Sequence, residues 1–427
     1  MMRAAMLGAV ALAIIIFGDL IAGLAFGGML ATGQADALGW LESQSVAMIG
    51  LAGLTIMAPA RWRWPLLICG AGGSLSSVGL LCGVAARSWP LAGMAVLAGV
   101  SLLALVGVLC TSRSCAGRWV GGTCLLLLAV VLSSMGFGHD RADVPTPEPK
   151  PTLAVMTALP LFWGDVGLDG GQTGSLRSPA PAMIALGRHF KIVPVNDGRG
   201  LSPYGRLLLA QPRLLVPTEL VAIDAWVRAG GRAVVLADPL LAWPMRMALG
   251  DRRRPPVTSL LDPLLTHWGL RLEAVDQSAA GMTRRFLADR SLLPVAAASR
   301  FSRAGKGCSL IENGLIALCR IGRGQVRLIA DADLLDDRLW LSDPDRPGSR
   351  RAATGDTMAL LAAWLTAPID LPALRAPQIR WVRNDASLIA AVRYALTAGI
   401  IWVILGGAMI GRRKPGVMPS DAPKSPR

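Results

Sequence analysis

One stretch of the sequence, residues 206–238, restricts the fold more than any other. It reads RLLLAQPRLLVPTELVAIDAWVRAGGRAVVLAD. Residues 207–210 and 233–237 are short, continuous apolar runs with no polar alternation. Such runs are typical of strands that are buried on both faces of a parallel sheet. The stretch therefore predicts two neighbouring strands inside an α/β domain.

The segment between these two runs has the pattern of a helix. Leu220, Ile223 and Val227 recur at helical spacing. Pro217 suits the first helical turn, and the glycine pair at 230–231 would end the helix. We therefore predict a βαβ unit, whose crossover is right-handed in almost all known proteins.

The chain is too apolar to be wholly soluble, because hydrophobic residues make up 53% of it and its mean hydropathy is +0.49. A helix of about 20 apolar residues crosses the core of a bilayer. Six segments are apolar enough to be considered, five before the soluble domain and one after it. They cover residues 4–30, 45–60, 64–86, 89–110, 119–138 and 390–410.

These segments divide the chain into regions. We predict a five-span transmembrane region (1–138), a Pro-rich linker (139–151), an α/β domain (152–368), a second linker (369–388), a C-terminal transmembrane helix (389–411) and a basic tail (412–427). The fold class is thus a membrane protein with α-helical spans and a Rossmann-like domain with a mostly parallel sheet.

Short loops rich in Lys and Arg usually face the cytoplasm. With a cytoplasmic N-terminus, that side collects Arg61, Arg63, Arg113, Arg118 and the basic tail, whereas Arg87 is the basic residue of the opposite loops. We therefore expect both termini to be cytoplasmic and residues 140–385 to be extracytoplasmic. In a bacterium with two membranes, the protein would lie in the inner membrane with this domain in the periplasm.

Asp19 lies in the middle of the first predicted span. A carboxylate inside a membrane is costly and is often functional, for example in proton coupling. The alternative is an acid that is hydrogen-bonded within the helix bundle.

Candidate binding residues follow the predicted strands of the α/β domain. Open parallel sheets bind ligands beyond the carboxyl ends of their strands. The polar or aromatic residues expected there are Trp163, Asp165, Gln211, Asp238, Asp331 and Asp333. The carboxylates could bind a cation or a polar ligand, or they could cap helices and turns.

The segment CSLIENGLIALC, residues 308–319, has the pattern of a β-hairpin with a type I′ turn at Asn313-Gly314. Counting outward from this turn places Cys308 opposite Cys319, at a hydrogen-bonded and therefore wider pair. A disulfide and two reduced core cysteines are both compatible with this pattern.

Several catalytic motifs are absent from the sequence. It has no GxxxxGK[ST], so the chain is not the ATPase of a transporter, and it has no GxSxG or HExxH. We therefore predict neither a catalytic residue nor a cofactor nor a metal. The arginines are scattered and no nucleic-acid-binding signature occurs, so we expect no nucleic-acid partner.

The predicted βαβ unit with "DAWVRAGGRAVVLADP", and the later "GRGQVRLIADADLL", resemble the soluble domain of GldG-like auxiliary components of ABC transport systems. The resemblance covers roughly residues 150–365 and includes Asp238, Asp331 and Asp333. It implies a class I glutamine-amidotransferase-like domain without amidotransferase chemistry, held outside the membrane beside a transporter.

The resemblance implies a non-catalytic accessory subunit, with the lipid bilayer and an ABC permease and ATPase as partners. One alternative is a membrane-tethered, metal-dependent hydrolase or amidase that uses Asp331 and Asp333. A second alternative is a structural envelope protein.

Overall fold

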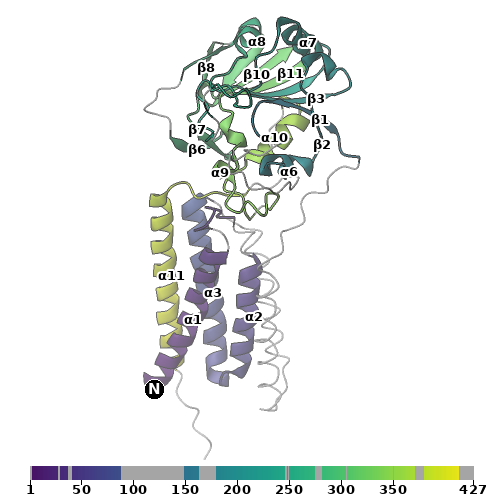
Figure 1. Cartoon of the computed structure of the whole chain (residues 1–427). Coiled ribbons are helices and arrows are strands. Elements are labelled where there is room, and N and C mark those ends of the chain that lie inside the picture. The colour runs from purple at the N-terminus through teal and green to yellow at the C-terminus, as the bar shows by residue number, and fades with distance from the viewer. Residues whose placement is uncertain are drawn as a thin grey trace, which may run out of the picture. The chain divides into compact units, whose positions relative to one another are not determined.

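The chain forms two compact units, one of residues 1–139 with 380–427 and one of residues 140–379. The computed structural model in Figure 1 describes residues 2–26, 29–36, 41–87, 149–162, 179–245, 248, 250–274, 281–303, 305–349, 351–370 and 379–412. Each unit is considered by itself below.

The first unit is helical and consists of α1 (Met2–Phe26), α2 (Leu41–Met57), α3 (Ala60–Ala86) and α11 (Asp385–Arg412). α1, α3 and α11 are long and apolar enough to cross a membrane, whereas the apolar part of α2 is shorter. These helices confirm the apolar character of three predicted spans. The spans predicted at 89–110 and 119–138 lie outside the described residues, and α11 begins four residues before the predicted boundary at 389.

Glycines allow α1 and α11 to pack closely. A side chain at Gly8 would meet Ile410, and a Cβ atom at Gly407 would lie 3.2 Å from that of Ala9. Contacts between the start of α1 and the end of α11 mean that these two helices are antiparallel.

The end of α3 lies beside the start of α11. The Arg383 amide donates to the Ala85 carbonyl at 3.1 Å, and the Ser387 hydroxyl donates to the same carbonyl at 3.2 Å. The end of α3 and the start of α11 therefore lie at the same end of the bundle.

The second unit is built on a seven-stranded sheet in the order β2-β1-β3-β4-β11-β10-β9. The pairs among the first five of these strands are parallel, and β10 and β9 extend the sheet as antiparallel strands. The strands are β1 (Thr152–Thr157), β2 (Lys191–Pro194), β3 (Arg206–Ala210), β4 (Arg232–Leu236), β9 (Cys308–Ile311), β10 (Ile316–Ile321) and β11 (Gly324–Ile329). A mostly parallel α/β sheet was predicted and is confirmed.

The predicted βαβ unit is present as β3, α7 (Pro217–Arg228) and β4. Ile223 and Val227 are buried, as helical spacing requires, and Leu220 packs against them as a partly buried side chain. Gly230 ends the helix with a φ of +118°, a conformation that favours glycine.

Helices cover both faces of the sheet (Figure 1). α6 (Pro181–Gly187), α9 (Asp337–Trp340) and α10 (Thr357–Thr366) share a core with Leu153 and Val155 of β1. α7 and α8 (Asp262–His267) share a second core with Ala154 and Met156. The alternation of neighbouring β1 residues between two cores explains the continuous apolar runs in the sequence.

Two small antiparallel pairs complete the described part of the domain, β5 (Arg271–Leu272) with β8 (Phe301–Arg303), and β6 (Met282–Phe286) with β7 (Leu292–Ala296). Three 3₁₀ turns lie at η1 (Gly198–Leu201), η3 (Glu312–Gly314) and η4 (Asp333–Leu335).

In the β9–β10 hairpin, Cys308 pairs with Cys319 in the register and the two are joined by a disulfide. The predicted wide spacing is wrong, because their Cα atoms are only 4.0 Å apart. The next pair outward carries the hydrogen bond, from the Arg320 amide to the Gly307 carbonyl at 2.8 Å. Glu312 also has a positive φ, of +53°, so the turn is not the simple two-residue loop that the count assumed.

Candidate functional site

Three aspartates meet at the carboxyl ends of β4 and β11. These strands are parallel neighbours with Leu236 opposite Ile329, and Asp238 and Asp331 each stand two residues beyond this pair. Asp333 begins η4, directly after Asp331 and Ala332. The three side chains are 0%, 0% and 1% exposed, and one carboxylate oxygen of each lies within 4.8 Å of the others.

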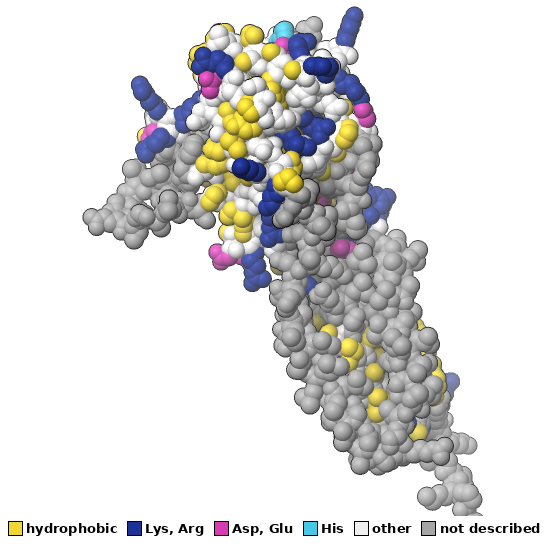
Figure 2. Space-filling model, turned by 90° about the vertical axis from the view of Figure 1, so that its right-hand side faces the viewer, with side chains coloured by type: hydrophobic (Ala, Val, Ile, Leu, Met, Phe, Trp, Pro, Cys, Tyr) yellow, Lys and Arg dark blue, Asp and Glu magenta, His cyan; other side chains and the backbone are white. Residues whose placement is uncertain are grey.

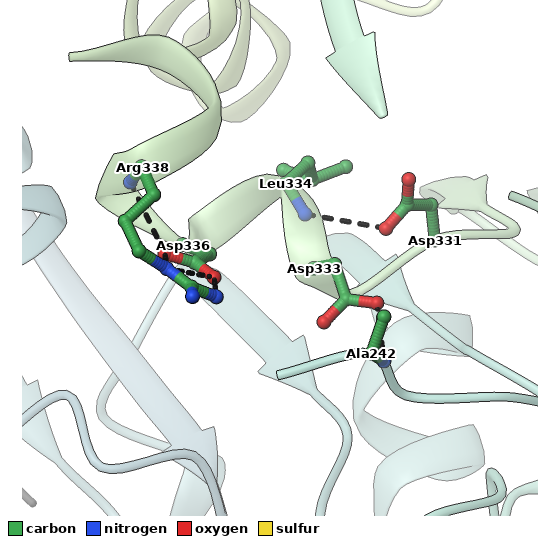
Figure 3. Close-up of polar contacts among 6 residues, drawn as sticks. All are labelled: Ala242, Asp331, Asp333, Leu334, Asp336 and Arg338. Carbon is green, nitrogen blue, oxygen red and sulfur yellow. Dashed lines mark hydrogen bonds and ion pairs between the residues drawn. The ribbon is translucent and has the colours of Figure 1, made fainter. Parts of the chain in front are cut away.

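Backbone amides bind these carboxylates from several loops. Figure 3 shows the Leu334 amide directed at Asp331, and Ala242 beside Asp333. The donors are Leu240 (2.8 Å) and Ala332 (3.1 Å) for Asp238, Ala296 (3.0 Å) and Leu334 (3.2 Å) for Asp331, and Ala242 (2.7 Å) for Asp333. Each carboxylate therefore joins its own loop to another or closes a turn. This corresponds to the second alternative from the sequence, in which the acids cap helices and turns.

One carboxylate oxygen of the cluster, Oδ1 of Asp333, is buried and has no hydrogen-bond partner among the described residues. In the same part of the chain, no Lys, Arg or His side chain forms an ion pair with any of the three carboxylates. The cluster is therefore a group of buried acids without an ion-paired basic side chain among the described residues, and the nearby Arg338 interacts with Asp333 only at longer range.

The surroundings favour the protonated forms of these acids. Burial, and after it the negative charge of the nearby Asp238, raise the pKa of Asp333 to about 8. Burial also raises the pKa of Asp331 well above its usual value, with smaller contributions from Asp238 and Asp333. The pKa of Asp238 is raised by burial, although the Leu240 and Ala332 amides oppose this shift.

Gln211 lies at the end of β3 but does not join the carboxylates. Its buried side chain donates to the carbonyls of Asp238 and Pro256, both at 3.1 Å, and accepts from the Asp238 amide at 3.1 Å. Its φ is +42°, which is unusual for a residue with a side chain. Gln211 thus connects the ends of β3 and β4.

Trp163 and Asp165 fall outside the described residues. They follow β1, where the strand order changes direction between β2 and β3. Ligands of open α/β sheets usually bind at such a switch point. The aspartate cluster lies elsewhere, at the ends of β4 and β11.

Sequence reasoning missed the neighbours of the cluster. Asp336, whose charge acts on Asp333, caps α9 and pairs with Arg338 (Figure 3). Most donors are backbone amides, which carry no signal in a sequence. The one available sign was the density of acids after β11, at 331, 333, 336 and 337.

Asp19, the acid of the first predicted span, lies between α1 and α3. The Ser74 hydroxyl donates to its Oδ2, whereas Oδ1 has no partner within the described residues. Its side chain is 5% exposed. This geometry corresponds to the predicted alternative of an acid that is hydrogen-bonded within the bundle.

On the face of the α/β domain that Figure 2 shows, Lys and Arg side chains lie at several separate places. A shallow depression of about 220 Å³ lies beside the disulfide and contains the Arg320–Asp370 ion pair.

The comparisons with known proteins identify no family. No family model matches the chain, and no curated protein does. Solved structures give distant matches, such as the exo-β-1,4-mannosidase Op5Man5 from Opitutaceae bacterium strain TAV5, with 14% identity and a TM-score of 0.32 over 58% of this chain and 40% of that one.

Two further matches are of the same kind. The β-galactosidase from Rahnella sp. R3 has 16% identity and a TM-score of 0.26 over 53% of this chain and 37% of that one. The cytoplasmic protein STM1381 from Salmonella typhimurium LT2 has 10% identity and a TM-score of 0.27 over 43% and 88%. The chain thus spans about two fifths of the length of the two glycosidases.

Proposed function

We propose that this chain is a membrane-anchored, non-catalytic accessory subunit of an ABC-type transport or export system. Its amidotransferase-like α/β domain binds a partner protein or a polar ligand outside the cytoplasmic membrane. Both termini are cytoplasmic, and the bundle docks on a permease that works with a separate ATPase.

The observation that carries this proposal is the insertion of the α/β domain into a helix bundle. The domain lies in the sequence between α3 and α11, and these two helices pack against each other through Ala85, Arg383 and Ser387. A domain anchored at both of its ends stays beside the membrane and beside any protein that the bundle contacts. The resemblance to GldG-like auxiliary components supports the same assignment.

The chemistry of the aspartate cluster supports a non-catalytic role. Asp331 and Asp333, the acids that a metal-dependent hydrolase would use, are 0% and 1% exposed, so their carboxylates do not line an open pocket. Within the described residues, no Ser, Cys or His side chain hydrogen-bonds to the cluster. A nucleophile or a general base held by these acids is therefore not part of the described site.

Co-purification tests the proposal. The tagged full-length chain is extracted from its native membrane in mild detergent, with and without prior cross-linking, and the recovered proteins are quantified by mass spectrometry. An unrelated tagged multi-span protein is the control. We expect an ATP-binding subunit and a permease in near-equal amounts with the chain. Recovery of the chain alone, even after cross-linking, contradicts an accessory role and favours a structural envelope protein.

A further inference from the structure

We propose that Asp238, Asp331 and Asp333 bind one hard divalent cation, Ca²⁺ or Mg²⁺, as a structural site of the α/β domain. The argument rests on the geometry of this domain, and it holds whether or not the chain serves a transporter.

The first step is the convergence of ligand atoms. One oxygen from each carboxylate lies within 4.8 Å of the other two. Ca²⁺ bonds to oxygen at 2.3–2.6 Å, so two ligands on opposite sides of the ion are roughly 4.8 Å apart. The distances between these carboxylate oxygens therefore already match the spacing of ligands around a bound Ca²⁺.

The second step is the unpartnered oxygen. Asp333 is 1% exposed, and its Oδ2 accepts from the Ala242 amide at 2.7 Å. Its carboxyl group is also hydrogen-bonded to that of Asp238, but its Oδ1 accepts from no N–H or O–H donor among the described residues. A buried polar atom without a partner is costly, because it has lost its hydration without gaining a hydrogen bond. Coordination of a cation would satisfy this oxygen.

The third step is charge. Buried acids in proteins are normally paired with a basic side chain or coordinate a metal. Within the described residues, no ion pair joins any of the three carboxylates to a basic side chain. Five backbone amides hold the carboxylates in place but carry no net charge. A divalent cation offsets most of the negative charge of three carboxylates.

The ligand set determines the kind of ion and its role. Carboxylate oxygens prefer hard cations such as Ca²⁺ and Mg²⁺ over the metals that bind nitrogen and sulfur. Since the three side chains are shielded from solvent, the ion would be structural. It would connect the loops after β4 and β11 with η4, and through the Ala296 amide it would also reach β7.

The test uses the full-length chain in detergent. It is treated with a chelator, dialysed, and supplied with Ca²⁺, Mg²⁺ or neither. Bound metal is measured by elemental mass spectrometry, and the melting temperature of the domain by tryptophan fluorescence. We expect one equivalent of one cation per chain and a rise in melting temperature of about 5 °C or more.

Asp333→Asn keeps the side-chain volume and the oxygen that accepts from Ala242, but it removes one charge. We expect at least a tenfold weaker affinity for the cation. Asp197→Asn is the matched control, because Asp197 caps η1 at an exposed position away from the cluster and Asn also caps helices well. Its affinity should equal that of the unmodified chain.

The proposal is overturned if the unmodified chain binds no stoichiometric cation and melts at the same temperature with chelator, Ca²⁺ and Mg²⁺. Protons would then neutralise the cluster. These measurements use the unmodified chain, so they remain decisive even if the Asp333→Asn variant fails to fold. A metal-free chain that still co-purifies with a permease would contradict the cation site and leave the accessory role intact. A metal-loaded chain that is recovered alone would support the cation site and contradict the accessory role.

Discussion

The environment of Asp333 makes its protonation depend on folding. Burial and the neighbouring Asp238 raise the pKa of this carboxyl to about 8, compared with 3.8 in an unfolded chain. Between these two pH values the folded state keeps a proton that the unfolded state releases. In metal-free conditions, the stabilising effect of this proton is complete below about pH 4 and is lost as the pH rises toward 8.

We therefore expect the metal-free α/β domain to become less stable between pH 5 and pH 8. Melting temperatures recorded in chelator at several values across this range should fall by several degrees, since about 1 kcal/mol changes the melting temperature of a 150–250-residue domain by roughly 2–4 °C. Asp333→Asn has no proton to lose and should show a shallower fall. A melting temperature that stays constant or rises with pH contradicts the prediction.

The disulfide between Cys308 and Cys319 spans a sequence separation of 11 residues. A loop of about this size restricts the unfolded chain enough to stabilise the fold by roughly 2–3 kcal/mol. Replacing both cysteines with Ser should lower the melting temperature of the domain accordingly. If a reductant destabilises the unmodified chain but not the double variant, the stabilisation comes from this disulfide. Equal destabilisation of both proteins by the reductant contradicts the prediction.

At the scale of elements, three arginines bind the C-terminus of α10. Arg327 donates to the carbonyls of Trp364 (2.7 Å), Ala367 (3.0 Å) and Pro368 (2.8 Å), while Arg206 and Arg232 donate to those of Leu365 and Thr366. The last carbonyls of a helix have no partners within the helix and carry a partial negative charge, so cations stabilise them. β3, β4 and β11 thus hold the helix that covers one face of the sheet.

Arg327→Met should test this interaction, because Met preserves much of the apolar stem. Arg327 is 5% exposed, and its loss leaves three carbonyls without a donor. We expect a loss of about 2–4 kcal/mol in the free energy of unfolding. Arg323→Met, at an exposed position of the turn between β10 and β11, should change it by less than about 0.5 kcal/mol. Similar losses from both variants would show that the contacts of Arg327 contribute little.

The close contact between α1 and α11 leads to a prediction about the stability of the helix bundle. A Cβ atom at Gly406 would collide with Leu12 and lie 3.1 Å from the Cβ atom of Cys69, whereas one at Gly18 of α1 would meet nothing within 4 Å. Gly406→Val should therefore separate the helices and reduce the monodisperse fraction in size-exclusion chromatography by about half or more. Gly18→Val should behave like the unmodified chain, and equal behaviour of both variants contradicts the packing.

At the scale of the whole molecule, the start of α1 and the end of α11 lie at one end of the bundle. If the bundle spans a membrane, both termini face the same side. We expect alkaline phosphatase fused after residue 150 to be active, because that enzyme needs an oxidising, extracytoplasmic compartment. The same enzyme fused after residue 412 should be inactive. Activity in the second fusion alone would reverse the proposed orientation.

Much of the fold could be predicted because it depends on local patterns. The βαβ unit from β3 to β4 was visible in its apolar runs, its helical spacing and its glycines. The register that places Cys308 opposite Cys319 followed from the turn at Asn313-Gly314. Their wide spacing was predicted wrongly, because the left-handed conformation of Glu312 depends on the folded turn and leaves no mark in the residue types.

The candidate site could be predicted only in part. Parallel strands end at one edge of a sheet, so residues after β4 and β11 were expected near each other, and Asp238, Asp331 and Asp333 do meet there. Gln211 was expected among them but binds the backbone of Asp238 and Pro256 instead. The position of Trp163 and Asp165 stays a prediction.

Hydrophobic periodicity and turn residues act over a few neighbouring positions, so the apolar helices, the α/β class of the domain and the strand ends at which acids collect could all be predicted from residue types. The joint burial of three of these acids without an ion-paired basic side chain, and the return of α11 to α1 and α3, became visible only in the folded chain. Both depend on contacts between residues that are far apart in the chain, and the backbone amides that bind the acids are present in almost every residue.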